Sequence, residues 1–176
     1  MTTDLASALM RVMGNEEFVS AMERFAGAFP RYRDRLPSVP YAYSRTRLTA
    51  TPDYEIVVMN WAPQSMSPIH DHGTSRCWVL MLDGILDVQN FTCDAGDPAR
   101  EDAAIRQAER IALRAGDIDH RLGPAELHRV RNPSVSESAF SLQLYARPLT
   151  TYSVVDAHSN RRRTVTATCE LELVLD

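Results

Sequence analysis

The chain has 176 residues, 44% of them hydrophobic and 24% charged, which is enough to bury one core and excludes a disordered chain. The formal net charge of −4 argues against nucleic acid as a partner, because proteins that bind nucleic acid usually present a strongly basic face. No apolar run approaches the ~20 residues that a membrane-spanning helix needs, and the acidic first residues do not resemble a signal peptide. We therefore predict a cytoplasmic protein with no membrane partner and no obligate protein partner.

The first part of the chain, residues 1–40, is predicted to be a helical segment that packs on the rest. Apolar residues recur at helical spacing over residues 4–36, with an interruption at Gly14. Three prolines are expected to end the helical part: Pro30, Pro37 and Pro40.

The remainder, residues 41–176, changes to short runs with period two that are rich in Val, Ile, Thr and aromatic residues. The last run is the clearest, because apolar residues from Val165 to Leu175 alternate with Thr and Glu. Many short strands separated by turn signals predict a mainly β domain, a sandwich or barrel of which the jelly roll is one type. The candidate strands are residues 41–49, 54–61, 77–82, 85–91, 110–114, 127–131, 138–146, 152–156 and 164–175.

Three of the five histidines are candidate metal ligands. His70 and His72 are two positions apart, so in a strand both point to one face, and His128 lies in a distant strand-like run. Together they would direct three imidazole nitrogens into a barrel and leave positions on the ion for substrate and oxygen. On spacing alone, a pair of ordinary surface histidines stays open as an alternative. His120 and His158 lie in polar, turn-like stretches and are not expected to be ligands.

The segments around these histidines resemble two motifs of a known family. The run from His70 to Cys77 is similar to the first cupin motif in the form found in cysteine dioxygenases, and the run from His128 to Asn132 is similar to the second. The resemblance spans about residues 41–152, with the motifs in the family's order. It implies a single-domain cupin jelly-roll β-barrel with Fe(2+) on the three histidines. It also implies oxidation of a small thiol by O2 to a sulfinic acid.

The resemblance extends to the expected substrate site. Tyr43-Ser44-Arg45 is similar to the family's Tyr-x-Arg, whose arginine binds the substrate carboxylate. A guanidinium suits this role because its planar fork donates two hydrogen bonds to a carboxylate. Tyr152 stands where the animal enzymes have a pocket-lining Cys. The predicted substrate-binding residues are Arg45, Tyr43, Tyr145 and Tyr152, although the residues alone leave open that Arg45 is an ordinary surface arginine.

A further run, Ser141-Leu142-Gln143-Leu144-Tyr145, resembles the family's Ser-x-His-x-Tyr strand, and its polar residues alternate, so they share one face. The resemblance makes Tyr145 the partner of Cys77 in a thioether bond, as in the animal enzymes. Gln143 replaces the family's His, and an amide forms hydrogen bonds but carries no proton at neutral pH. The predicted catalytic residues are Tyr145, Cys77, Ser141 and Gln143. The alternative for Cys77 is a plain buried cysteine.

The resemblance leaves the thiol open. L-cysteine, giving cysteine sulfinate, is the first candidate. The changes at Gln143 and Tyr152 make a larger carboxylated thiol such as ergothioneine a competitor, because Tyr152 could stack on its ring. A third candidate is 3-mercaptopropionate, which Arg45 disfavours because the related enzymes for that substrate carry Gln at this position.

Two other classes of function also fit the residues. A zinc cupin hydrolase or isomerase is one, since three histidines suit zinc equally well. It would need an acidic side chain inside the barrel, but Asp71 is expected to point away and no other acid is evidently placed. The other class is a non-catalytic small-molecule-binding cupin, against which the intact set of three histidines argues.

Overall fold

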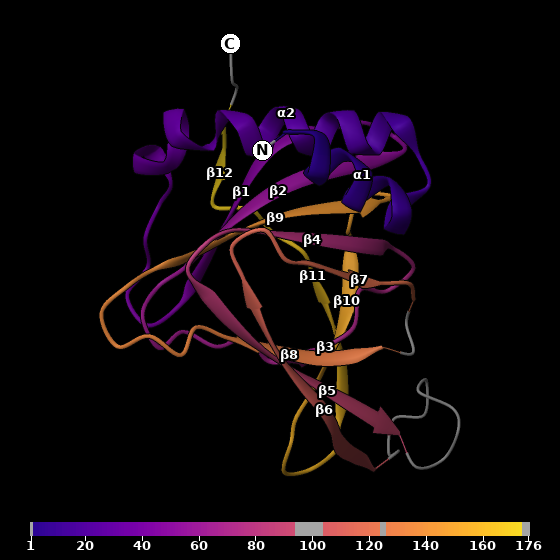
Figure 1. Ribbon diagram of the computed structural model, residues 1–176. Coiled ribbons are helices and arrows are strands. Elements are labelled where there is room, and N and C mark those ends of the chain that lie inside the picture. Colours follow the sequence, from indigo (N-terminus) through magenta and orange to yellow (C-terminus); the bar gives the residue numbers. More distant parts are fainter. Residues whose placement is uncertain (1, 94–103, 124–125, 174–176) are drawn as a thin grey trace.

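The computed structural model describes residues 2–93, 104–123 and 126–173. Two six-stranded β-sheets face each other, and two helices cover the outer face of one of them (Figure 1). This arrangement confirms the predicted mainly β jelly roll with a helical segment at the N-terminus. In the described part of the chain, no helix is long and apolar enough to cross a bilayer.

The first sheet has the strand order β12-β1-β2-β9-β4-β7, and the second has the order β11-β10-β3-β8-β5-β6. Neighbouring strands among the described residues run antiparallel, except that β12 is parallel to β1. The first sheet consists of β1 (Tyr43–Ala50), β2 (Tyr54–Trp61), β4 (Arg76–Asp83), β7 (Ile118–Arg121), β9 (Ala139–Ala146) and β12 (Leu171–Glu172). The second consists of β3 (Ile69–His70), β5 (Ile85–Cys93), β6 (Ile105–Arg114), β8 (Leu127–Arg131), β10 (Thr151–Val155) and β11 (Arg162–Thr166).

The first sheet is buried on both faces and lies between two hydrophobic clusters. Successive side chains of a strand point to opposite faces, so Trp78 and Leu80 of β4 join the cluster under the helices. Their neighbours Cys77 and Val79 join the cluster between the two sheets. The central strands therefore read as nearly continuous apolar runs, and only the inner face opens towards a functional site.

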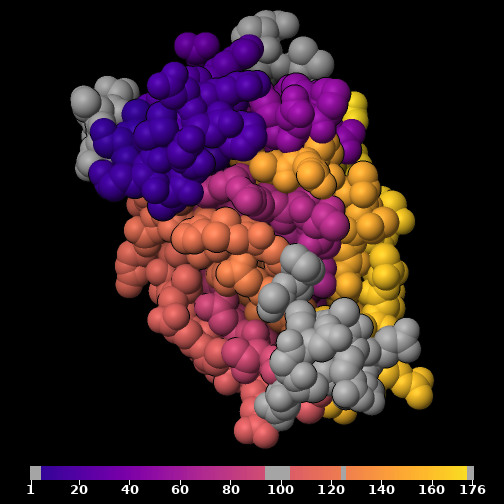
Figure 2. All heavy atoms as spheres, turned by 90° about the vertical axis from the view of Figure 1, so that its right-hand side faces the viewer, coloured from indigo at the N-terminus to yellow at the C-terminus, as the bar shows by residue number. Residues whose placement is uncertain are grey.

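The helices are α1 (Thr2–Met13) and α2 (Glu16–Tyr32), followed by the short 3-10 helix η1 (Arg33–Arg35). The predicted interruption is present, since Gly14 has a φ of +62° and the Asn15 side chain accepts the Phe18 N–H at 3.1 Å as the N-cap of α2. Figure 2 shows that these helices cap one end of the molecule.

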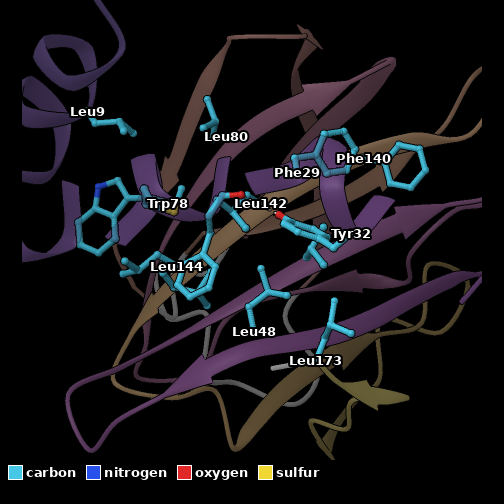
Figure 3. Close-up of a cluster of buried hydrophobic side chains, with 14 of the residues drawn as sticks. Leu9, Phe29, Tyr32, Leu48, Trp78, Leu80, Phe140, Leu142, Leu144 and Leu173 are labelled. Atoms are coloured by element: carbon cyan, nitrogen blue, oxygen red, sulfur yellow. Dashed lines mark hydrogen bonds between the residues drawn. The ribbon is translucent and has the colours of Figure 1, made fainter. Parts of the chain in front are cut away.

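The apolar faces of the helices form a cluster with the first sheet (Figure 3). Leu9, Phe29 and Tyr32 from the helices belong to the same cluster as Leu142 and Leu144 of β9. Both of these leucines are fully buried, and each buried side chain of this size contributes about 1.5–3 kcal/mol. The helical segment therefore stabilises the sheet that carries part of the site.

Two details of the helices and of the C-terminal strand differ from the prediction. Pro30 lies inside α2 rather than after its end. The predicted strand 164–175 is two strands, β11 and β12, which belong to different sheets. The chain leaves the strand conformation between them, where Arg45 holds it: the Glu170 N–H donates to the Arg45 carbonyl, and Arg45 Nη1 donates to the Thr168 carbonyl. Residues 174–175 of that prediction lie outside the described residues.

Candidate metal centre and its cavity

Three histidines converge inside the barrel. His70 lies on β3, His72 follows it in the next loop, and His128 lies on β8, where it pairs directly with His70 across the two strands. Their ligand atoms all lie within 4.8 Å of one another, and the Nε2 atoms of His70 and His128 are 3.3 Å apart. Two nitrogens that bind one ion at a right angle, each at about 2.1 Å, would be about 3 Å apart. The cluster is therefore arranged to hold a metal ion.

The chemical state of these imidazoles suits a metal. Burial lowers the pKa of His70, and it lowers the pKa values of His72 and His128 well below their usual range, so the three rings are neutral. His70 Nδ1 lies 2.9 Å from the Pro68 carbonyl, which can only accept, so Nδ1 carries the proton and Nε2 keeps its lone pair. Metals bind the neutral form of histidine.

The loop after His70 is held by one carboxylate. Asp71 Oδ1 accepts hydrogen bonds from the Gly73 and Ser153 N–H groups, each at 2.9 Å, so Asp71 is engaged with the backbone rather than with the cavity. Gly73 has a φ of +55°, and a Cβ at this position would lie 2.4 Å from the Thr151 carbonyl oxygen. Both features demand glycine here. The turn therefore fixes the position of the His72 backbone and the direction in which its side chain points.

Gly73→Ala is expected to destabilise the protein by more than the about 1–2 kcal/mol that a left-handed backbone alone costs an alanine, because the added methyl group also meets Thr151. Gly14→Ala is the matched control, since Gly14 has a φ of +62° and open space around it. Thermal unfolding of the two variants measures the difference. Equal losses of stability would show that the close approach to Thr151 has no energetic weight.

A cavity opens beside the three histidines between the two sheets. Eight of the ten predicted site residues line it: Tyr43, Arg45, His70, His72, His128, Gln143, Tyr145 and Tyr152. The remaining two, Cys77 and Ser141, are fully buried. Ser141 Oγ accepts the indole N–H of Trp61 at 3.1 Å.

Arg45 is buried rather than on the surface, with 8% of the residue exposed. Its Nη1 donates to the Thr168 carbonyl at 2.9 Å, and its Nη2 lies 3.6 Å from Glu55 Oε1 without forming a hydrogen bond to any described residue. Its guanidinium carbon lies 5.7 Å from the centre of the Tyr145 ring. A buried cation therefore borders the cavity with a donor nitrogen unused.

Tyr145 is surrounded by the other predicted catalytic residues. Cys77 on β4 and Tyr145 on β9 face each other across neighbouring strands, and the Tyr145 hydroxyl donates to Gln143 Oε1. Burial raises the pKa values of both Cys77 and Tyr145 above their ordinary ranges, so the thiol and the phenol stay protonated. The Tyr145 ring meets His72 edge-on at 5.5 Å.

Two more tyrosines close the side of the cavity near Arg45. Tyr152 on β10 packs edge-on against His70, with ring centres 5.8 Å apart. Tyr43 packs against Trp61 at 4.8 Å. Burial, with smaller contributions that include Tyr152, raises the pKa of Tyr43 to about 12.

An ion pair that the sequence pattern does not predict lies in this region. The polar stretch around His120 is predicted to be turn-like, but the structure places Asp119 and Arg121 on β7, where Asp119 lines the cavity and Arg121 is buried. The expectation that no acid beyond Asp71 is placed inside the barrel is therefore wrong. The signal that could have found them is the alternation Ile118-Asp119-His120-Arg121, in which every second residue faces the same side.

Comparisons with known proteins assign this architecture. The chain matches the family "Cysteine dioxygenase type I" over residues 14–161. It is 30% identical over 129 residues to cysteine dioxygenase type 1 of Homo sapiens, which covers 73% of this chain and 62% of the human one; the Rattus norvegicus enzyme is 31% identical with the same coverage. The chain thus spans 62% of the length of these relatives.

One solved structure shares the fold. The protein TT1209 from Thermus thermophilus superposes with a TM-score of 0.50 at 19% identity, over 66% of this chain and 94% of that one. A cupin superfamily protein from Desulfitobacterium hafniense has a TM-score of 0.47 at 12% identity, over 64% of this chain and 84% of its own. One family accounts for the barrel, for the three converging histidines and for the match over residues 14–161. The chain belongs to the cysteine dioxygenase type I family and has the cupin fold.

Proposed function

We propose that this protein is an Fe(2+)-dependent thiol dioxygenase that oxidises a small carboxylated thiol with O2 to its sulfinic acid. L-cysteine, giving cysteine sulfinate, is the first candidate substrate. The observation that carries the proposal is the combination of three neutral histidines with a buried arginine, Arg45, whose Nη2 has no hydrogen-bond partner among the described residues. The family assignment supports the same class of reaction.

His70, His72 and His128 would hold the metal. They fit a divalent ion because all three are neutral. In addition, no described residue forms a hydrogen bond with the buried Nδ1 atoms of His72 and His128, so no such hydrogen bond holds the two rings in another orientation. When bound, iron supplies the site where thiolate and O2 meet and exchange electrons. Three neutral ligands leave the ion its full charge, which favours binding of the thiol as thiolate.

Arg45 would bind and orient the substrate. A buried guanidinium with an unused Nη2 attracts a carboxylate strongly, because a desolvated donor is costly to leave unpaired. Glu55 balances part of the charge from 3.6 Å, and Glu55 in turn also contacts Arg47. With its carboxylate held at this side, the thiol end of a small substrate is directed towards the histidines that line the same cavity.

Tyr145 and Gln143 would position the reacting groups. Because the Tyr145 hydroxyl donates its hydrogen bond to Gln143 Oε1, the phenol oxygen keeps lone pairs to accept a hydrogen bond, and the glutamine fixes its direction. The high pKa of Tyr145 keeps the phenol protonated while it does so. Gln143 would therefore orient the phenol but would not exchange a proton with it. The histidine that the family has at this position could do both.

The pairing of Cys77 with Tyr145 predicts that the purified, active protein contains a fraction of molecules lighter by two hydrogen atoms. The two residues face each other across β4 and β9, which allows a thioether bond between the thiol and the ring. Intact mass after many turnovers, and a cross-linked peptide after digestion, measure it. Cys77→Ser is the control that must abolish the lighter species. Detection of the unlinked mass alone would refute the bond.

Oxygen uptake by the iron-loaded protein tests the proposed function. A panel of thiols that includes L-cysteine, ergothioneine, 3-mercaptopropionate and cysteamine should contain at least one that drives O2 consumption. The product should be the sulfinic acid, heavier by two oxygen atoms that both come from labelled O2. Zinc-loaded protein is the control and should consume no O2. Iron-loaded protein that consumes no O2 with any of these thiols would refute the proposal.

A further inference from the structure

The ion pair on β7 is a second charged group of the cavity. Asp119 Oδ2 accepts from Arg121 Nη2 at 2.6 Å and from Nε at 3.1 Å, and Arg121 Nη1 donates to Asn90 Oδ1 at 2.8 Å. Arg121 is thus fixed on two sides and only 6% exposed. After burial, the charge of Arg121 is among the smaller causes that lower the pKa values of all three histidines, so Arg121 lies in the electrostatic environment of the metal centre.

One oxygen of this pair remains available. Both hydrogen bonds from Arg121 go to Oδ2, and Oδ1 of Asp119 has no hydrogen-bond partner among the residues that the structure describes. The Asp119 side chain lines the cavity. The Asp119 carboxylate, which Arg121 holds in place, therefore offers a fixed hydrogen-bond acceptor to a ligand in the cavity.

The cavity consequently has two complementary charged atoms. Arg45 has the unused donor Nη2, and Asp119 has the unused acceptor Oδ1. Arg45 lies on β1 and Asp119 on β7, with β2, β9 and β4 between them in the sheet. Four strand spacings amount to about 19 Å along the backbone of this one sheet, so the two side chains reach the same cavity from well-separated strands.

A purely structural role does not account for this arrangement. A buried ion pair usually contributes no more stability than well-packed apolar residues of similar volume. Apolar side chains line the cavity nearby: Val79, Leu86, Val88 and Leu113. Val79 is the direct partner of Asp119 across β4 and β7, so the acid stands where an apolar residue would complete the lining.

We propose that Asp119, positioned by Arg121, is a specificity-determining residue that accepts a hydrogen bond from an N–H group of the substrate remote from the carboxylate that Arg45 binds. The inference rests on the proposed function and narrows its substrate class. Under this proposal, a carboxylated thiol whose N–H donor is several bonds from its carboxylate can contact both residues at once. L-cysteine cannot, because its ammonium and carboxylate groups share one carbon and are only two bonds apart.

Binding of four thiols to the iron-loaded protein without oxygen tests the inference by calorimetry. Ergothioneine carries ring N–H groups and cysteinylglycine carries an ammonium group remote from the carboxylate; L-cysteine and 3-mercaptopropionate carry no remote N–H. The variant Asp119→Asn keeps an acceptor for Arg121 but removes the charge. It is expected to lower affinity for ergothioneine and cysteinylglycine about 10- to 100-fold relative to 3-mercaptopropionate. The ratio of L-cysteine to 3-mercaptopropionate should change much less.

Two further variants keep the test decisive. Asp87→Asn is the matched control, because Asp87 also pairs with an arginine, Arg110, on a strand of the second sheet, and it should change no ratio. The double variant Asp119→Ala with Arg121→Met is the substitute if Asp119→Asn fails to fold. It removes both charges and therefore leaves no unpaired arginine buried in the barrel. It should lose the same discrimination.

The outcomes separate this inference from the proposed function. If wild-type protein consumes O2 with a thiol but Asp119→Asn weakens all four thiols equally, Asp119 determines no specificity and the inference fails alone. Failure of ergothioneine and cysteinylglycine to bind the wild type also overturns it. If no thiol drives O2 consumption, the proposed function fails whatever the binding data give.

Discussion

Replacement of His128 by alanine is expected to abolish metal retention and oxygen consumption together. The three histidines share one cluster with ligand atoms within 4.8 Å, so loss of one leaves two nitrogens for the ion. Even outer hydrogen-bond partners of metal ligands typically change metal affinity about 10- to 100-fold, so loss of a direct ligand should exceed that range. Metal content after dialysis and O2 uptake with the preferred thiol measure the two effects.

A readout independent of turnover accompanies this test. An ion that binds the folded protein raises its unfolding temperature, so added Fe(2+) without oxygen should stabilise the wild type and leave His128→Ala unchanged. His120→Ala is the matched control, since His120 is an exposed histidine on β7. It should keep metal, stabilisation and turnover. Full iron content and turnover in His128→Ala would mean that the metal lies elsewhere.

The sequence predicts the bounds of a strand well where the residues of that strand follow one burial pattern from end to end. The prediction for β8 has the observed bounds, and that for β9 agrees within one residue, because their burial follows a simple pattern. The C-terminal strand shows the limit of the rule. Alternation from Val165 onwards continues through residues that belong to different sheets. The break between the two strands is held by contacts with distant residues, among them the Arg45 carbonyl, more than a hundred residues earlier.

The candidate site divides in the same way. The spacing of His70 and His72 predicts a shared direction on the assumption that both lie in a strand. The structure brings both to His128, although β3 is only two residues long and His72 lies beyond its end. Asp119 and Arg121 are missed because the stretch around His120 is mostly polar and therefore resembles a turn. Their pairing inside the barrel depends on tertiary contacts, with Asn90 on β5 and with the strand β4 beside them, which no local pattern contains.

Arg45→Ala is expected to reduce kcat/KM for a carboxylated thiol with a loss of roughly 2–4 kcal/mol of transition-state binding, or about 30- to 900-fold. The reason is that Arg45 is buried with an unused Nη2, so a bound carboxylate forms its hydrogen bonds away from water. Most of the loss should appear in KM. Cysteamine, which has no carboxylate, should lose much less.

Arg45 also holds the Thr168 carbonyl and lies near Glu55, so a structural effect must be separated from a binding effect. Arg47→Ala is the matched control, because Arg47 pairs with the same Glu55 carboxylate at 3.3 Å but its side chain is 35% exposed. If the role of Arg45 is to bind the carboxylate, Arg47→Ala should alter stability without altering the preference for carboxylated thiols. Equal losses for cysteamine and the carboxylated thiol in Arg45→Ala would show instead that Arg45 supports the barrel and leaves substrate recognition to other residues.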